Sequence, residues 1–324
     1  MRPDDSQNPN QYIYQIEHPI ECSYRNDSPI HGAPFHSHAH YEVYYFQEGE
    51  CTYLIGDKLM VLQPGDLILM HGMTLHCANP SPDKPYVRSI LHFNPAYVHK
   101  LLRSEPAAGL LGPFEELRNA RLSLDPEQRA EVERLYAQMA KLAEKRKREG
   151  GAGSAAALDK LDVLFLELLL LIRGWFESPA GEGEQRPQQE EHVQGVLSYL
   201  EEHYAEELTL DAIADALHLT KPYLSNLFKR VTGTTVFKYL YNRRINQAKI
   251  LFRFEPHRSV SSVSKAVGFS HLAHFSRLFK TTVGMSPQQY RGRINDSSRE
   301  VPGAAREPVR INAEPVPLPH RYDK

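Results

Sequence analysis

Cysteine is scarce in this chain of 324 residues, which contains only Cys22, Cys51 and Cys77. The three are widely separated, odd in number and form no Cys-x-x-Cys pair, so neither a disulfide framework nor a cysteine zinc site is expected. This usage is typical of a protein in a reducing compartment.

Long apolar runs are also missing. The most apolar run, "VLFLELLLLI" at 163–172, is too short to span a bilayer and contains Glu167. The first residues, "MRPDDSQNPN", show no basic region followed by an apolar core, as a secretory signal would. We therefore expect a soluble cytoplasmic protein with no membrane partner.

Acidic residues are nearly absent from 221–295, where Glu255 stands among fourteen lysines and arginines. The stretch therefore carries a charge of +13, although the whole chain carries only -2. A block of one charge is usually solvated surface, but clustered cations are also how nucleic-acid-binding proteins attract phosphate.

What is present divides the chain in two. Residues 11–95 contain alternating runs such as "VYYFQEGECTYLIGDKLMVLQPGDLILM", whose glycine and proline turns predict consecutive antiparallel strands. Apolar residues at helical spacing then predict one helix from Asp125-Pro126 and another over 155–176. The second helix has a wide apolar stripe, which fits either packing against the strands or a subunit interface.

An internal repeat follows a polar linker: "IADALHLTKPYLSNLFKRVTG" from Ile213 resembles "VSKAVGFSHLAHFSRLFKTTVG" from Val263. Each copy has a short helix, a tight turn, a hydroxyl residue placed to cap the next helix (Thr220, Ser270) and a second amphipathic helix. Gly268 can take the positive φ that ends the short helix. The pattern predicts two helix-turn-helix modules, which read DNA with exposed residues of the second helix.

Helical spacing leaves polar and basic residues of both second helices exposed. Asn226 and Arg277 are the best candidates for reading bases, because asparagine can pair with adenine and arginine with guanine. Lys229 and Lys280 are expected to contact phosphate. The predicted DNA contacts are Lys221, Pro222, Ser225, Asn226, Lys229, His271, Leu272, Ala273, Ser276, Arg277 and Lys280.

Residues 190–293 resemble the paired helix-turn-helix domain of the AraC/XylS family of bacterial transcriptional regulators. The second copy carries the Gly-Phe, Phe-Lys, Gly, Ser-Pro and Tyr-Arg elements of that family's signature, and "RRINQAKILF" at 243–252 is similar to the helix that joins its modules. The resemblance implies recognition helices in successive major grooves on one face of promoter DNA, and activation through RNA polymerase. His271 and His274 depart from the family pattern, and the base-reading face is apolar at Leu272 and Ala273.

The stretch "HSHAHYEVYYFQEG" at 36–49 has three histidines and a glutamate at alternate positions. In an extended strand these four side chains project from one face. The stretch resembles the first motif of the cupin barrel that often precedes this DNA-binding domain. Gly65 and His76 have the spacing of the second cupin motif, from which His71 and Met73 depart.

The cupin resemblance supplies a possible metal set of His36, His38, Glu42 and His76, suited to manganese, iron, nickel or zinc. In regulators of this type the same interior is usually an effector pocket, so we expect no metal cofactor and no enzymatic activity. A sugar or a similar polar metabolite is the expected ligand. The predicted effector contacts are His36, His38, His40, Glu42, Tyr44 and His76.

The sequence thus predicts a multidomain β + α chain. Its parts are a cupin-like antiparallel β-barrel at 1–112, a helical pair for dimerisation at 113–177, a linker at 178–190, an all-α double helix-turn-helix domain at 191–294 and a disordered tail at 295–324. Three functions stay open: a homodimeric transcriptional regulator controlled by an effector, a metal-dependent cupin enzyme with an attached DNA-binding module, and a constitutive DNA-binding protein whose barrel only dimerises. We favour the first.

Overall fold

The computed structural model describes residue 16 and residues 18–29, 35–102, 105–115, 119–148, 155–176 and 187–297. The predicted tail lies outside these ranges from 298 onward, but its first residues, 295–297, belong to α11 (Pro287–Ser297). The predicted linker lies outside them up to 186. The last residues of that linker instead begin α5 (Gln188–His203). Among the described helices, none is long and apolar enough to cross a membrane.

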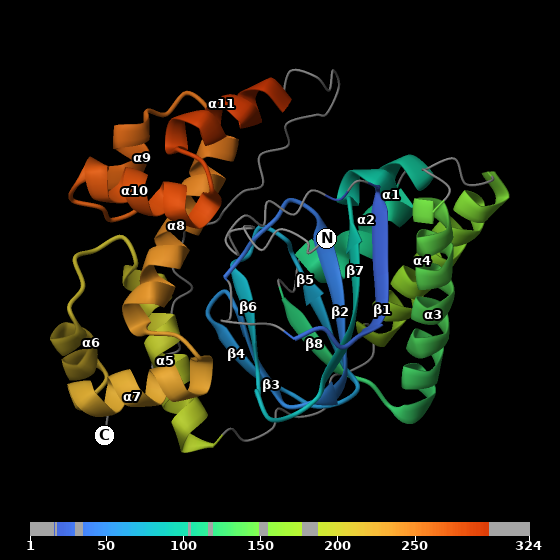
Figure 1. Ribbon diagram of the computed structural model, residues 1–324, viewed down its shortest axis with the longest axis horizontal. Helices are drawn as coiled ribbons and strands as arrows, with labels where there is room; N and C mark the ends of the chain where they lie inside the picture. Colours follow the sequence, from blue (N-terminus) through green and yellow to red (C-terminus); the bar gives the residue numbers. More distant parts are fainter. Residues whose placement is uncertain are drawn as a thin grey trace, which may run out of the picture.

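The described N-terminal half is built from two antiparallel sheets (Figure 1). The larger sheet has the order β1-β7-β2-β5-β8 and the smaller has the order β4-β3-β6. The strands are β1 (Ile20–Asn26), β2 (Tyr41–Gly49), β3 (Cys51–Ile55), β4 (Lys58–Leu62), β5 (Asp66–Met70), β6 (His76–Pro80), β7 (Tyr86–Phe93) and β8 (Ala120–Ser123). The prediction of an antiparallel all-β half is confirmed.

The two-residue period of β2 decides what each face of the larger sheet contacts. Val43 and Tyr45 point toward a layer of helices and join a core with them. Tyr44 and Phe46 point the other way and pack between the two sheets, together with Tyr53 of β3. This inner core is closely filled, since Tyr44 is 1% and Phe46 0% exposed.

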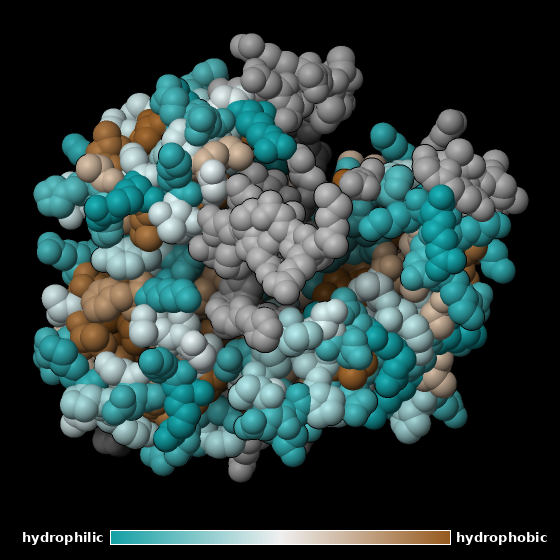
Figure 2. Space-filling model, viewed as in Figure 1, coloured by the Kyte–Doolittle hydropathy of each residue, from teal (hydrophilic) through white to brown (hydrophobic). Residues whose placement is uncertain are grey.

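Helices pack on the outer face of the larger sheet. In the described part they are α1 (Pro95–Leu101), α2 (Glu105–Glu115), α3 (Pro126–Arg148) and α4 (Ala155–Phe176). Both helices predicted for this region are confirmed. Leu164 and Leu169, which widen the apolar stripe of α4, are buried in this core, whereas Val163 and Leu170 are 62% and 57% exposed. Figure 2 shows mainly hydrophilic side chains over α3.

The boundary predicted at 112 does not coincide with a break in the structure. It falls inside α2, and β8 then returns the chain to the larger sheet, where Leu67 pairs with Leu122. The segment 113–177 is therefore not a helical pair alone. Strand β8 was not predicted, because "ARLS" at 120–123 is short and has no long alternating pattern.

The described C-terminal half is all-helical, as predicted. After α5 it contains α6 (Leu210–Ala216), α7 (Lys221–Thr232), α8 (Val236–Phe254), α9 (Val260–Ala266), α10 (Leu272–Val283) and α11 (Pro287–Ser297). The pairs α6–α7 and α9–α10 are the two helix-turn-helix modules, and Figure 1 shows them toward opposite ends of α8. The internal repeat in the sequence is thus a repeat in the structure.

The two recognition helices, α7 and α10, end alike but begin differently. Each ends at a glycine with positive φ, 71° at Gly233 and 83° at Gly284. Thr220 caps α7 through its side chain, as predicted. The predicted cap at Ser270 is wrong, because His271 precedes the first residue of α10 and its side chain makes no capping bond. The extra residue of the second copy lies before the helix, so His271 occupies the place equivalent to Thr220.

Each module also needs a left-handed residue in its turn. Gly268 has the predicted positive φ, 88°, and a Cβ there would press against the backbone of Ala205. In the first module His218 takes this conformation, with φ 55°. Both short helices can therefore end sharply before the recognition helix.

The two sheets of the N-terminal half, called the barrel from here on, share a hydrophobic core with the first module. Leu54 and Leu59 of the smaller sheet pack with apolar residues of α5, α6, α7 and α8, among them Phe228. The Tyr239 hydroxyl also donates to the backbone oxygen of Gly56 at 2.6 Å. The core of the second module, as far as it is described, contains no barrel residue. The first module is therefore joined to the barrel more firmly than the second.

Candidate effector site and DNA-binding surface

The alternating histidines do not lie on one strand, so that part of the prediction is wrong. β2 begins only at Tyr41, and residues 35–40 form a loop before it. A backbone bridge joins this loop to β6: His36 N donates to His76 O and His76 N donates to His36 O, both at 3.0 Å.

Gly72 accounts for the path of this loop. Its backbone oxygen accepts a hydrogen bond from His38 N at 2.8 Å. A Cβ at position 72 would collide with the backbone oxygen of His40. No role was predicted for this glycine, which stands one residue before Met73, the position where the cupin resemblance calls for glycine.

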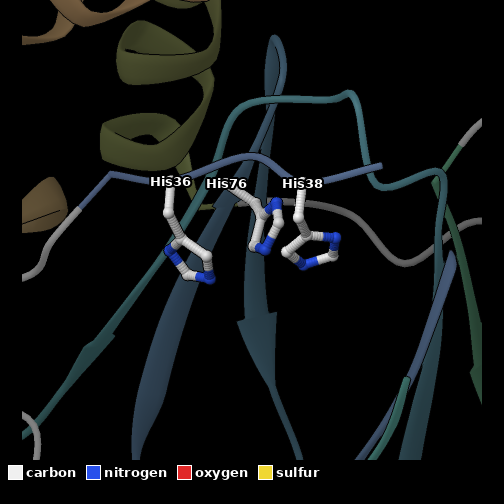
Figure 3. A group of neighbouring side chains, drawn as sticks. All are labelled: His36, His38 and His76. Atoms are coloured by element: carbon white, nitrogen blue, oxygen red, sulfur yellow. The ribbon is translucent and has the colours of Figure 1, made fainter. Parts of the chain in front are cut away.

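The loop nevertheless gathers the predicted residues. Figure 3 shows the rings of His36, His38 and His76 projecting to the same side, and one nitrogen of each lies within 4.8 Å of the others. Glu42, at the start of β2, adds a carboxylate whose Oε2 lies 3.2 Å from His38 Nε2 and 3.6 Å from His76 Nε2. We call His36, His38, His40, Glu42, His76 and His92 the histidine cluster.

His92 is the member that sequence analysis missed. Strand β7 pairs with β2 in a register that sets His92 opposite Glu42, and His92 Nε2 lies 3.1 Å from Glu42 Oε2. With His38 and His40 it forms a second group whose ligand nitrogens lie within 4.8 Å of one another. The only sign of it in the sequence is the alternation of residues within 86–93. That alternation places His92 beside Glu42 only once the pairing of β7 with β2 is known.

Tyr44 lies one layer below the histidine cluster, as part of the inner core. Its hydroxyl shares a hydrogen bond of 2.8 Å with the hydroxyl of Tyr86. Its ring packs edge-on against Tyr53, whose own ring stacks on that of His76 with centroids 6.5 Å apart. The structure therefore connects Tyr44 to the histidines through Tyr53.

Burial controls the charges in the histidine cluster. It lowers the pKa of His38 to about 4 and that of His40 to about 2, because a buried imidazolium loses its hydration. Burial alone would raise the pKa of the Glu42 carboxyl, but the neighbouring imidazoles of His92, His38 and His76 hold that pKa well below its usual range. At neutral pH an ionised Glu42 thus faces a neutral His38.

Backbone carbonyls fix the tautomers of two rings. His38 Nδ1 lies 2.9 Å from His40 O, and His76 Nδ1 lies 2.9 Å from Thr74 O. A carbonyl only accepts, so both Nδ1 atoms carry a proton, and the Nε2 atom of the neutral His38 ring then presents a lone pair to Glu42. A cation bound between this Nε2 and the Glu42 carboxylate would satisfy both acceptors, and histidines that bind metal are oriented by such carbonyl contacts.

The predicted DNA contacts lie on the outer faces of α7 and α10, opposite their buried leucine and phenylalanine side chains. Ser225 and Ser276 are half-buried, and all the others are exposed. Lys221 Nζ forms an ion pair with Asp211 Oδ2 at 2.8 Å, which partly compensates its charge. As DNA contacts these residues remain predictions.

Not every cation of 221–295 is available to DNA. Arg243 pairs with Glu201 at 2.7 Å, and Arg244 donates to the backbone oxygens of Tyr204 and Glu206, each at 2.6 Å. These two arginines hold α8 to the segment around the end of α5. The charge counted in the sequence therefore exceeds the charge that is left for the predicted DNA contacts.

Each half of the chain matches a known protein family model. A family model for the AraC-like ligand binding domain matches residues 18–161, and a model for a helix-turn-helix domain matches residues 213–293. The chain is 33% identical to the HTH-type transcriptional activator RhaS of Salmonella schwarzengrund (strain CVM19633) and 32% identical to RhaS of Salmonella arizonae, over 144 residues each. Each match covers 44% of this chain and 50% of the relative. The chain thus spans about half the length of the curated relatives it matches.

Two solved structures are also similar. One is the C-terminal domain of AraT, a response regulator from Geobacillus stearothermophilus, at 27% identity over 33% of this chain and 88% of that chain, with a TM-score of 0.32. The other is an apo ToxT variant from Vibrio cholerae, at 11% identity over 86% of this chain and 98% of that chain, with a TM-score of 0.37. The two family models together match more than half of the chain: one covers the barrel and its helices, and the other covers the two modules. The chain belongs to the AraC family of regulators.

Proposed function

We propose that this protein is a sequence-specific DNA-binding regulator of transcription that acts in the cytoplasm. The observation that supports this most strongly is the duplicated module: α7 and α10 end at equivalent glycines, expose polar and basic faces, and are joined by α8. Two linked recognition helices read a longer site than one helix does. The similar RhaS proteins are named as transcriptional activators, which favours activation through RNA polymerase here.

The second part of the proposal is that an effector binds at the histidine cluster. Buried, convergent polar groups above an apolar core are typical of ligand sites, and a sugar or similar polar metabolite suits imidazole and carboxylate partners. However, His76 and Phe46 are both 0% exposed. A molecule as large as a sugar can therefore reach His76 only if neighbouring side chains move.

A divalent cation is a second candidate for the effector, and the tautomers favour it. The Nε2 atoms of His38 and His76 face the ionised Glu42, and His76 Nε2 has no hydrogen-bond partner among the described residues. With His36 these residues form a nitrogen and oxygen set that suits zinc, nickel, iron or manganese. In this proposal the cation is the sensed ligand, and no catalytic role is assigned to it.

We further propose that the protein is a homodimer through α4. Val163 and Leu170 are large, exposed and seven residues apart, so they lie on one face of the helix. The same face of a second copy can cover them in a two-fold contact. Such a dimer presents two pairs of modules to a promoter.

Selection of duplexes from a random DNA pool by the full-length protein tests the DNA-binding proposal. The expected result is a shared site with two short motifs about one helical turn apart, one for each recognition helix. Recovery of no shared sequence, with equal affinity for all duplexes, would contradict the proposal.

Elemental mass spectrometry of the purified, untagged protein tests the cation. Near-stoichiometric metal that is lost in a His36→Ala, His38→Ala double variant supports it. His99→Ala, which removes an exposed histidine on α1, is the matched control and should keep the metal. Metal-free protein that still binds its selected duplex would reject the cation and leave polar metabolites as the effector.

A further inference from the structure

Ser37 stands between two members of the histidine cluster and contacts the helix that joins the DNA-binding modules. Its hydroxyl donates to Asn246 Oδ1 on α8 at 2.5 Å. Lys249, one turn further along α8, donates through Nζ to the backbone oxygen of Ser37 at 2.9 Å and also to its hydroxyl. The backbone that carries His36 and His38 is therefore held by α8.

The second loop of the cluster is held by the same helix. Asn246 Nδ2 donates to the backbone oxygen of Met73 at 3.0 Å. The next residue, Thr74, supplies the carbonyl that orients the His76 ring. Two of the three chain segments that bring histidines to the cluster therefore form hydrogen bonds with Asn246, and one of them also with Lys249. The third segment is β7, which carries His92.

These contacts fall on the part of α8 that belongs to the second module. Tyr239 and Leu240, earlier in α8, are in the core shared by the barrel and the first module. Ile245 and Ala248, beside Asn246 and Lys249, are in the separate core of the second module. Movement of the loops would therefore act on the second module and leave the first module with the barrel.

We infer that Asn246 and Lys249 are positioning residues through which the state of the histidine cluster sets the placement of the second helix-turn-helix module relative to the first. The inference rests on the proposed function, and it names how the proposed effector site regulates DNA binding. It predicts that the effector site alters contact with one half of the DNA site, the half read by α10.

The physical reason lies in the different bonding of the two modules. A shared apolar core is buried over many residues and resists separation, whereas a few directional hydrogen bonds can exchange partners when a loop shifts. Among the described residues, it is hydrogen bonds rather than a shared core that join the barrel to the second module's part of α8. An effector changes this equilibrium to the extent that it binds one arrangement more tightly than the other.

A double-mutant cycle on the full-length protein tests the inference. Affinity for the selected duplex is measured for the wild type, His76→Ala, Lys249→Met and the double variant. We expect His76→Ala to change affinity, and the change to differ by roughly fivefold or more in the Lys249→Met background, as coupled sites do. A second cycle with Asn246→Ala keeps the test valid if Lys249→Met fails to fold, which circular dichroism reports.

The matched control is Thr52→Val. It removes a hydrogen bond from the Thr52 hydroxyl to Val231 O, 3.0 Å long, between the barrel and the first module. Its cycle with His76→Ala should be additive. Repeating the cycles on duplexes with one half-site scrambled locates the coupling, which should vanish only when the half-site that depends on Arg277 is scrambled.

Additive cycles for both Lys249→Met and Asn246→Ala would overturn the inference, and so would coupling that persists without the Arg277-dependent half-site. Equal coupling in the Thr52→Val control would overturn it too, because the barrel would then act through the first module. Failure to select any duplex is a separate result: it refutes the proposed DNA-binding function, and the inference with it.

Discussion

The ammonium group of Lys249 lies 2.9 Å from the backbone oxygen of Ser37, and so joins α8 to the loop that carries two histidines of the cluster. A lysine in this place is desolvated, and burial lowers its pKa from 10.5 to about 8. The contact therefore links the effector site, the DNA-binding half and a titratable group.

The stability contributed by Lys249 should depend on pH. Between pH 8 and 10.5 this lysine keeps its proton in the unfolded chain and loses it in the folded chain. The free energy of unfolding therefore increases as the pH rises through that window. Below pH 8 the penalty for burying the charge is fully present. We expect the stability of the wild type relative to Lys249→Met to rise across the window in urea unfolding. A constant difference would contradict the burial of a charged Lys249.

Arg277→Ala should cost about 1–3 kcal/mol of binding free energy on the selected duplex and relax specificity at one base pair, because arginine bonds guanine with two hydrogen bonds. The measurement compares the selected duplex, its single-base variants and a random duplex. Equal losses on selected and random DNA would remove Arg277 from the base-reading residues.

Lys280→Ala should weaken binding to selected and random duplexes alike, because a phosphate contact carries no sequence information. The slope of log affinity against log salt should fall in magnitude by about 0.9, the value for one neutralised phosphate. Lys100→Ala, at an exposed lysine on α1, is the control and should leave the slope unchanged. The phosphate contact is excluded if Lys280→Ala behaves like this control.

The proposed dimer depends on Val163 and Leu170. A Val163→Ser, Leu170→Ser double variant should sediment as a monomer at micromolar concentration, because it removes the apolar face that a second copy would cover. Leu272→Ser is the matched control: this leucine is also large and 45% exposed, but it lies on α10. Loss of the dimer in the control alone would place the interface on the DNA-binding half.

Local periodicity was enough to predict much of this architecture. The alternation in β2 separates the inner Tyr44 from the outer Val43, and the repeat of residue types 50 or 51 positions apart gives the two modules. The cap at Ser270 failed because the alignment of the repeat does not say where its extra residue lies. That detail depends on the turn, and the structure places the residue before His271.

The full histidine cluster could not be predicted from local sequence patterns. His36, His38 and Glu42 share a motif, but His92 joins them through the pairing of β7 with β2, which no short stretch reveals. The bond between Ser37 and Lys249 spans 212 positions. Such contacts follow from how the two halves pack, and neither residue carries a local signal of the other.

We propose that α7 and α10 bind one face of the same DNA site together. The most direct test inserts about five base pairs, roughly half a helical turn, between the two motifs of the selected duplex. The full-length protein should then lose most of its specific affinity, because the two half-sites face opposite sides of the DNA, and a further insertion that completes the turn should restore part of it. Unchanged affinity after the half-turn insertion would show that the two helices do not bind one face of the site together.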